Sequence, residues 1–401
     1  MTIKELESFI SVAREDLANI HKRSLKDSMK DVAKKALGRP SATKDMIFWP
    51  AGVLLFGLTE AITPVISESL KAEITTDINS FIKKWQDEGS EKVSFVDDSV
   101  FGAALLGMYK ITDDEKLKQS ASKIYDFLNN SPKNRTGSII YNPKAGNDYI
   151  FADGAGQSAM FLSRYGAEID DKAFELAATQ LINYYDHGMD FRSGLPYHAF
   201  TMSAAKKLGL LGWGRAMGWL IMGYAEFLTC IYKTSDIHND AAGQVILPAG
   251  IDSKTLDIIK EQLINLVRTT LSYQRLDGGF SWQLQAIEGE PDTSATAMIG
   301  YALARTLKSG IFDGAATNNS QNSSRNVNKG GDFDGNSTLS CESVKQSLLR
   351  MQDFILLHSE KGSVQKSLSG CEDIGVHRQV YGHYPWGQGA ALAMLTHTIQ
   401  L

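Results

Sequence analysis

Apolar residues recur at helical spacing along most of the chain, in two kinds of segment that alternate. Segments of the first kind have one apolar face and one face of Lys, Asp, Glu or Gln, as in a helix with one side in water. Six such helices are predicted, with apolar stripes that begin near residues 3, 74, 117, 174, 256 and 344. Segments of the second kind are apolar or small at nearly every position, so these helices must be buried on all sides. Six of them begin near residues 49, 98, 153, 213, 294 and 386.

This alternation is an internal repeat of a two-helix unit, lengthened by insertions later in the chain. Open helical solenoids keep a tighter period and expose their ends. A closed ring of hairpins instead places the buried helices inside and the amphipathic helices outside. The sequence therefore predicts an all-α fold, an (α/α)6 toroid, in which residues 1–401 form a single domain. Residues 311–341 are poor in apolar residues and rich in Asn, Ser and Gly, so we expect a mobile insertion there.

Composition and charge exclude several classes of partner. The formal net charge is -5, which offers no basic field for a nucleic-acid backbone. No apolar run approaches the roughly 20 residues of a membrane helix, and the charged, amphipathic start is unlike a signal peptide. Three widely spaced cysteines suggest neither a disulfide framework nor a zinc site. We expect a cytoplasmic protein, a monomer or homodimer, without a metal or cofactor.

The candidate site follows from the predicted topology. In a ring of hairpins the inner helices all start at one end, so residues at those starts converge on a central pocket. Aromatic rings beside carboxylates are typical of sugar sites, because apolar sugar faces stack on rings and hydroxyls bond to carboxylates. The residues of these types at or near helix starts are Trp49, Asp97, Asp98, Asp153, Gln157, Tyr197, His198, Trp213, Arg215, Trp219, Trp282, Asp292, Ser294, Thr296, His383, Tyr384 and Trp386.

Taken singly, each candidate also has a structural explanation. Asp98 and Asp153 could be helix N-caps, Arg215 could pair with a buried carboxylate, and the tryptophans could belong to the core. The clustering of all these residue types at one end of the ring favours a functional site. No nucleophile motif, phosphate-binding loop or metal-ligand spacing accompanies them.

Several motifs resemble glycoside hydrolase family 105, the unsaturated rhamnogalacturonyl hydrolases, and the related unsaturated glucuronyl hydrolases of family 88. W-G-R-A-M-G-W at residues 213–219 resembles the signature W-x-R-G-N-G-W, and G-L-P-Y-H-A-F at residues 194–200 is similar to G-L-x-Y-H. The block F-A-D-x-x-x-Q-S-A-M-F-L-S-R-Y-G around Asp153 is similar to W-x-D-x-x-x-M-x-x-x-F-L-A-R-x-G. Later blocks begin at Asp277, Asp292 and Pro385, so the resemblance spans roughly residues 46–400.

The chain departs from this family pattern in three places. Ala216 and Met217 replace the signature's Gly-Asn, and Asp292 stands where Glu is common. The histidine often seen shortly before the catalytic aspartate has no clear counterpart in S-I-I-Y-N-P-K-A-G-N-D-Y-I-F. These departures bear on sugar preference more than on the chemistry.

The resemblance implies an unusual hydrolysis of a small oligosaccharide left by polysaccharide lyases, as in pectin degradation. A carboxylic acid protonates C4 of a Δ4,5-unsaturated uronic acid, water adds at C5, and the hemiketal opens to release the aglycone. By position, Asp153 is the expected general acid and base and Asp98 its partner, with Asp97 the alternative if the register is shifted by one. A helix N-terminus lowers the pKa of an acid whereas burial and a neighbouring charge raise it, and the sequence leaves open which effect is larger.

The expected substrate-binding residues surround this pair. Arg215 is the expected partner of the substrate carboxylate, because a guanidinium can bind it at two points. Trp213 or Trp219 is expected to stack on a ring and His198 to bond a hydroxyl. Trp49, Asp97, Trp282 and Trp386 complete the set.

Three alternatives stay open at this stage. The first is an unsaturated glucuronyl hydrolase. The second is a sugar epimerase on the same toroid, which usually needs two histidines facing the ring centre, here His198 and His383. The third is a sugar-binding relative without activity.

Overall fold

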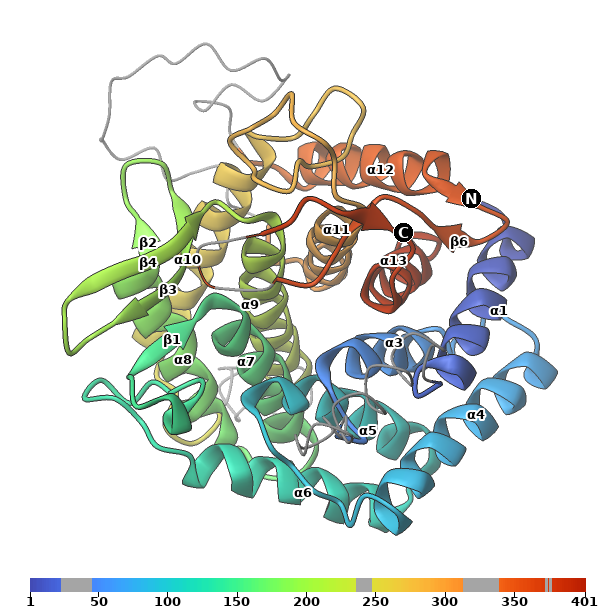
Figure 1. The fold of residues 1–401 in the computed structure, drawn as a ribbon, viewed down its shortest axis with the longest axis horizontal. Helices are drawn as coiled ribbons and strands as arrows, with labels where there is room; N and C mark the ends of the chain where they lie inside the picture. The colour runs from blue at the N-terminus through green and yellow to red at the C-terminus, as the bar shows by residue number, and fades with distance from the viewer. Residues whose placement is uncertain (23–44, 236–246, 313–338, 372–373, 375–376) are drawn as a thin grey trace, which may run out of the picture.

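Two concentric rings of helices make up the computed structural model, which describes residues 1–22, 45–235, 247–312, 339–371, 374 and 377–401 (Figure 1). The inner helices are α3 (Trp49–Glu60), α5 (Ser99–Thr112), α7 (Ala152–Glu168), α9 (Gly214–Ser235), α11 (Thr293–Lys308) and α13 (Pro385–Thr398). The outer helices are α1 (Ile3–Asn19), α4 (Glu68–Asp87), α6 (Glu115–Asn130), α8 (Ala173–Gly188), α10 (Ser253–Leu271) and α12 (Cys341–Leu357).

The inner ring is closed. Each inner helix packs against the next one along the chain, and α13 packs back against α3. Nearly every residue of the inner helices is buried, whereas only one face of each outer helix is. The predicted (α/α)6 toroid is therefore confirmed, with each buried segment in the inner ring.

Glycines allow the inner helices to approach closely. A Cβ atom at Gly57 on α3 would lie 2.2 Å from the carbonyl oxygen of Gly389 on α13. A Cβ atom at Gly156 on α7 would lie at the same distance from the carbonyl oxygen of Trp219 on α9. Larger side chains at these positions would force the helices apart and open the ring.

Short strands that the sequence analysis did not predict join the helices. β1 (Tyr149–Phe151) and β4 (Lys206–Leu211) pair antiparallel with β3 (Leu195–Thr201), which also pairs with β2 (Met189–Asp190). Two further ribbons are β5 (Ser359–Glu360) with β6 (Ser363–Val364), and β7 (Ser367–Leu368) with β8 (Tyr381–Gly382).

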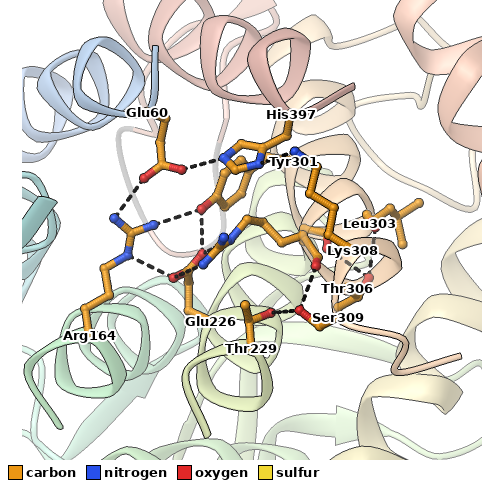
Figure 2. A network of polar contacts seen from close by, with 12 residues as sticks. Glu60, Arg164, Glu226, Thr229, Tyr301, Leu303, Thr306, Lys308, Ser309 and His397 are labelled. Carbon is orange, nitrogen blue, oxygen red and sulfur yellow. Dashed lines mark hydrogen bonds and ion pairs between the residues drawn. The ribbon is translucent and has the colours of Figure 1, made fainter. Parts of the chain in front are cut away.

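A buried polar network crosses the ring toward the C-terminal halves of the inner helices (Figure 2). Arg164 on α7 lies 2.9 Å from Glu60 on α3 and 2.8 Å from Glu226 on α9. Arg305 on α11 lies 2.9 Å from Glu226. His397 on α13 contacts Glu60 through Nε2 at 2.5 Å. Two guanidinium groups thus balance two carboxylates, and the network ties the first inner helix to the last.

The insertion expected at residues 311–341 lies mostly outside the described part of the chain, because residues 313–338 are not described. Within the described part of the chain, none of the helices has the length and apolar character needed to cross a membrane.

Candidate active site

A cavity of about 450 Å³ lies at the N-terminal ends of the inner helices. Eight of the seventeen candidate residues line it, namely Trp49, Asp97, Asp153, Gln157, His198, Trp213, Arg215 and Trp219. Trp49 and Asp153 come from the first turns of α3 and α7. The convergence of helix starts on one pocket is the arrangement that the repeat predicts.

Asp153 faces this cavity from the first turn of α7. Its Oδ1 atom is buried and has no hydrogen-bond partner among the described residues. Burial raises the pKa of Asp153 to about 7, although the nearby Arg215 charge and a backbone N–H group oppose the shift. Burial therefore outweighs the Arg215 charge and the backbone hydrogen bond, and the group can hold a proton near neutral pH.

Asp97 is the second carboxyl group in the cavity wall. It lies in a short 3-10 helix, Val96–Asp98, that leads into α5. The Tyr141 hydroxyl donates a hydrogen bond of 2.6 Å to its Oδ2 atom. Burial raises the pKa of Asp97 to about 7; the Tyr141 bond opposes the shift and the charge of Asp153 adds to it. The charge of Asp153 thus favours the protonated form of Asp97, in addition to the larger effect of burial.

Asp98 differs from its expected placement. Its Oδ2 atom accepts hydrogen bonds from the backbone N–H groups of Ser94 at 2.8 Å and Phe95 at 3.1 Å, and it is not part of the cavity wall. Consecutive side chains in a 3-10 helix point about 120° apart, so only one of two adjacent aspartates can face the pocket. Asp97, the alternative for a register shifted by one, occupies the position expected of Asp98.

Arg215 lines the cavity, but its terminal nitrogens are engaged in the protein. Nη1 donates to the carbonyl oxygen of Leu368 and Nη2 to that of Ser369, both at 2.7 Å. The guanidinium also lies 4.8 Å from the centroid of the Trp213 ring. Two-point binding of a substrate carboxylate would compete with these bonds. Both bonds connect Arg215 to the segment that continues into Gly370 and Cys371, which form part of the wall.

Trp282 and Trp386 do not line the cavity, in contrast to the expectation. The segment 365–371 covers the starts of α11 and α13. Its Leu368 N–H group donates to Asp292, and its Leu368 carbonyl accepts a 3.0 Å hydrogen bond from the Trp386 indole. The last two hairpins therefore reach the cavity through this segment rather than through their helix starts.

The two histidines of the epimerase alternative are not brought together. His198 lines the cavity from strand β3. His383 lies outside the cavity wall and contacts Asp16 of α1 through Nε2 at 2.9 Å. Among the described residues, no group of three or more His, Cys, Asp or Glu side chains is placed to hold a metal ion.

One side of the cavity is formed by residues that were not predicted from the sequence. The connection between α6 and α7 contributes Tyr141, Asn142, Asn147, Tyr149 and Phe151. These residues lie before a helix start, where helical periodicity gives no information. The available signal was the density of Tyr and Asn in the stretch that lacks the family's histidine.

A closed ring of helical hairpins, with paired carboxyl groups and tryptophans around a cavity at one end, defines a glycoside hydrolase of the six-hairpin class. The family model described as Glycosyl Hydrolase Family 88 matches residues 20–401. The chain belongs to this family, and the enzyme is a hydrolase of glycosyl bonds.

Solved structures share the fold over nearly the whole chain. A possible member of family 105 from Salmonella enterica is 16% identical, with a TM-score of 0.74 and coverage of 100% of this chain and 95% of that one. A family 105 glycoside hydrolase from C. acetobutylicum is 18% identical, with a TM-score of 0.65 and coverage of 94% and 99%. An unsaturated glucuronyl hydrolase from a Bacillus species is 13% identical, with a TM-score of 0.65 and coverage of 98% and 96%. No curated protein sequence matches the chain.

Proposed function

We propose that this enzyme hydrates the C4–C5 double bond of a Δ4,5-unsaturated uronyl residue and so releases the sugar attached to it. The observation that carries the proposal is the pair Asp97 and Asp153, which line one cavity together with tryptophans. Ordinary glycosidases use two carboxyl groups to displace a group at the anomeric carbon. Hydration of an enol ether needs only one carboxylic acid that protonates carbon and recovers its proton from water.

Asp153 is the general acid and base in this proposal. Its pKa of about 7 allows it to carry a proton at neutral pH, as a catalytic acid must. Asp153 gives this proton to C4 and then takes a proton from the water that adds at C5. The proton count of the enzyme is restored, and the C5 hemiketal opens with loss of the aglycone.

Asp97 is the partner carboxylate. Two interacting carboxyl groups do not readily ionise together, so the pair holds one proton over an interval of pH near neutrality. The Tyr141 hydroxyl donates to Asp97 and favours its charged form. The charge on Asp97 stabilises the positive charge that develops at C5 when C4 is protonated.

The preferred substrate in this proposal is a galacturonyl-rhamnose disaccharide from lyase-degraded rhamnogalacturonan. Elimination removes the stereocentres at C4 and C5, so galacturonate and glucuronate give the same unsaturated ring. Selection therefore depends on the anomeric linkage and on the aglycone. The resemblance of the other blocks to family 105, such as G-L-P-Y-H at residues 194–198, supports the rhamnose aglycone, while Ala216 and Met217 depart from the family signature.

Loss of ultraviolet absorbance from unsaturated disaccharides tests this function. The enzyme is expected to bleach the galacturonyl-rhamnose disaccharide faster than an unsaturated glucuronyl disaccharide, and Asp153→Asn is expected to abolish bleaching. Asp126→Asn, on the exposed face of α6, is the matched control and should act like the wild type. Full activity of Asp153→Asn would remove Asp153 from the mechanism. A faster reaction with the glucuronyl compound would reassign the substrate.

A further inference from the structure

Gln157 has a buried side-chain amide in the cavity wall, and its oxygen accepts no hydrogen bond from the described residues. It lies on α7 four residues after Asp153, so both side chains are on the same face of the helix. The residue is only 2% exposed and still lines the cavity. Its Oε1 atom has no hydrogen-bond partner among the described residues. Buried polar groups are nearly always paired, so an unpaired one facing a cavity marks a place for a ligand group.

The other unpaired atoms of the wall show which ligand group this is. Asp97 and Asp153 each have an unpaired Oδ1 atom, and Trp213 has an unpaired indole N–H group. Among these unpaired atoms and Gln157 Oε1, the three oxygens can accept a hydrogen bond, and only the Trp213 indole is a donor in this part of the wall. A ligand that complements it must bring several donors, as a sugar ring does with its hydroxyl groups. In the proposed function Asp153 transfers the proton and Asp97 stabilises the developing charge, which leaves the Gln157 amide to bind a hydroxyl group that does not react.

The backbone holds Gln157 at a fixed position relative to Asp153. Gly156 packs so tightly on α9 that a Cβ atom would lie 2.2 Å from the carbonyl oxygen of Trp219. On the next residue, the Ser158 hydroxyl donates to the carbonyl oxygen of Gly154 at 2.6 Å. Because Asp153 and Gln157 lie one turn apart on this closely packed helix, the carboxyl group and the amide can contact the same ring.

We propose that Gln157 determines substrate specificity by accepting a hydrogen bond from a hydroxyl group of the unsaturated uronyl ring that Asp153 protonates. This inference rests on the proposed function. Elimination removes the hydroxyl group at C4, so the hydroxyl groups left on that ring are those at C2 and C3. Gln157 accepts a hydrogen bond from one of these two hydroxyl groups. A ring that lacks this hydroxyl group leaves the buried amide unpaired, so the enzyme processes it more slowly.

A cycle of enzyme and substrate changes tests this inference. The substrates are the unsaturated galacturonyl-rhamnose disaccharide and its 2-deoxy and 3-deoxy analogues on the unsaturated ring. Gln157→Met keeps the length of the side chain and removes the acceptor. We expect Gln157→Met to lower kcat/KM on the parent disaccharide by about 10- to 100-fold relative to wild type. One deoxy analogue lacks the hydroxyl group that Gln157 binds, so wild type should already process it slowly. On that analogue, Gln157→Met and wild type should have the same kcat/KM. Gln346→Met, on the exposed side of α12, should leave all rates unchanged.

The kinetic results can contradict the proposed role of Gln157 in three ways. An equal loss on all three substrates, or no loss on the parent, would overturn it while the proposed function stands. If Gln157→Met lowers the Tm markedly, Gln157→Glu, which keeps an acceptor oxygen, should still discriminate the parent from that analogue, and loss of discrimination would overturn the inference. A wild type that processes none of the unsaturated substrates would overturn the proposed function and this inference with it.

Discussion

The Tyr141 hydroxyl donates a 2.6 Å hydrogen bond to the Asp97 carboxylate across the wall of the cavity. This contact joins an irregular connection to a 3-10 helix 44 residues earlier in the chain. A hydrogen bond to the charged form lowers the pKa of a carboxyl group, so Tyr141 limits the rise that burial causes at Asp97. The contact therefore biases which member of the carboxyl pair is ionised.

Tyr141→Phe is expected to raise the pKa of Asp97. The acid limb of the pH profile of kcat/KM, where the ionised partner gains a proton, should move up by about one pH unit. Tyr125→Phe, on the outer helix α6, should leave the profile unchanged. An acid limb that stays in place in Tyr141→Phe would show that Asp97 does not control it.

Asp97 and Asp98 are adjacent and chemically identical, so they form a matched pair of variants. Asp97→Asn is expected to lower kcat by about 10²- to 10⁴-fold without loss of stability, because Asp97, unlike Asp98, lines the cavity. Asp98→Asn is expected to retain activity, since an amide oxygen can still accept from Ser94 and Phe95. Asp98→Ala loses both bonds and should lower the free energy of unfolding by about 1–3 kcal/mol. Kinetics and urea denaturation measure the two effects, and the reverse pattern would restore Asp98 to the catalytic pair.

Glu226→Gln is expected to destabilise the ring. Glu226 is completely buried and pairs with Arg164 and Arg305, so its loss leaves excess positive charge in the interior (Figure 2). The free energy of unfolding should fall by about 3–5 kcal/mol in urea denaturation. Glu115→Gln, which removes an exposed pair with Lys118, should change it little. Equal small effects would mean that the network does not hold the inner helices together.

The Asp16 and His383 pair predicts a pH-dependent contribution to stability. The hydrogen bond to Asp16 raises the pKa of His383 above its usual value. The charged pair therefore stabilises the fold fully below the unfolded pKa of about 6.5, and this contribution is lost as pH rises through the higher folded pKa. The Tm difference between wild type and Asp16→Asn should be larger at pH 6 than at pH 9. The same difference at both pH values would contradict this assignment.

Hydrophobic patterning was enough to predict the architecture. Helices that are apolar all round require enclosure, and alternation with amphipathic helices leaves a closed ring as the simplest way to provide it. The place of Asp153 at a helix start was predictable for the same reason, and its expected role followed from the family resemblance. The strands were missed because segments such as Tyr149–Phe151 are short and lie in connections without periodicity.

The sequence by itself thus determined the ring and the end at which the candidate residues gather, and its family resemblance pointed to Asp153 as the first carboxyl group of the proposed pair. Only the tertiary structure decided the second, because the turn of a 3-10 helix points Asp97 rather than Asp98 into the cavity. It also decided the partners of Arg215, which include a carbonyl group 153 residues later in the chain. Such choices depend on the direction of side chains and on contacts between distant segments, and periodicity along one segment carries no information about either.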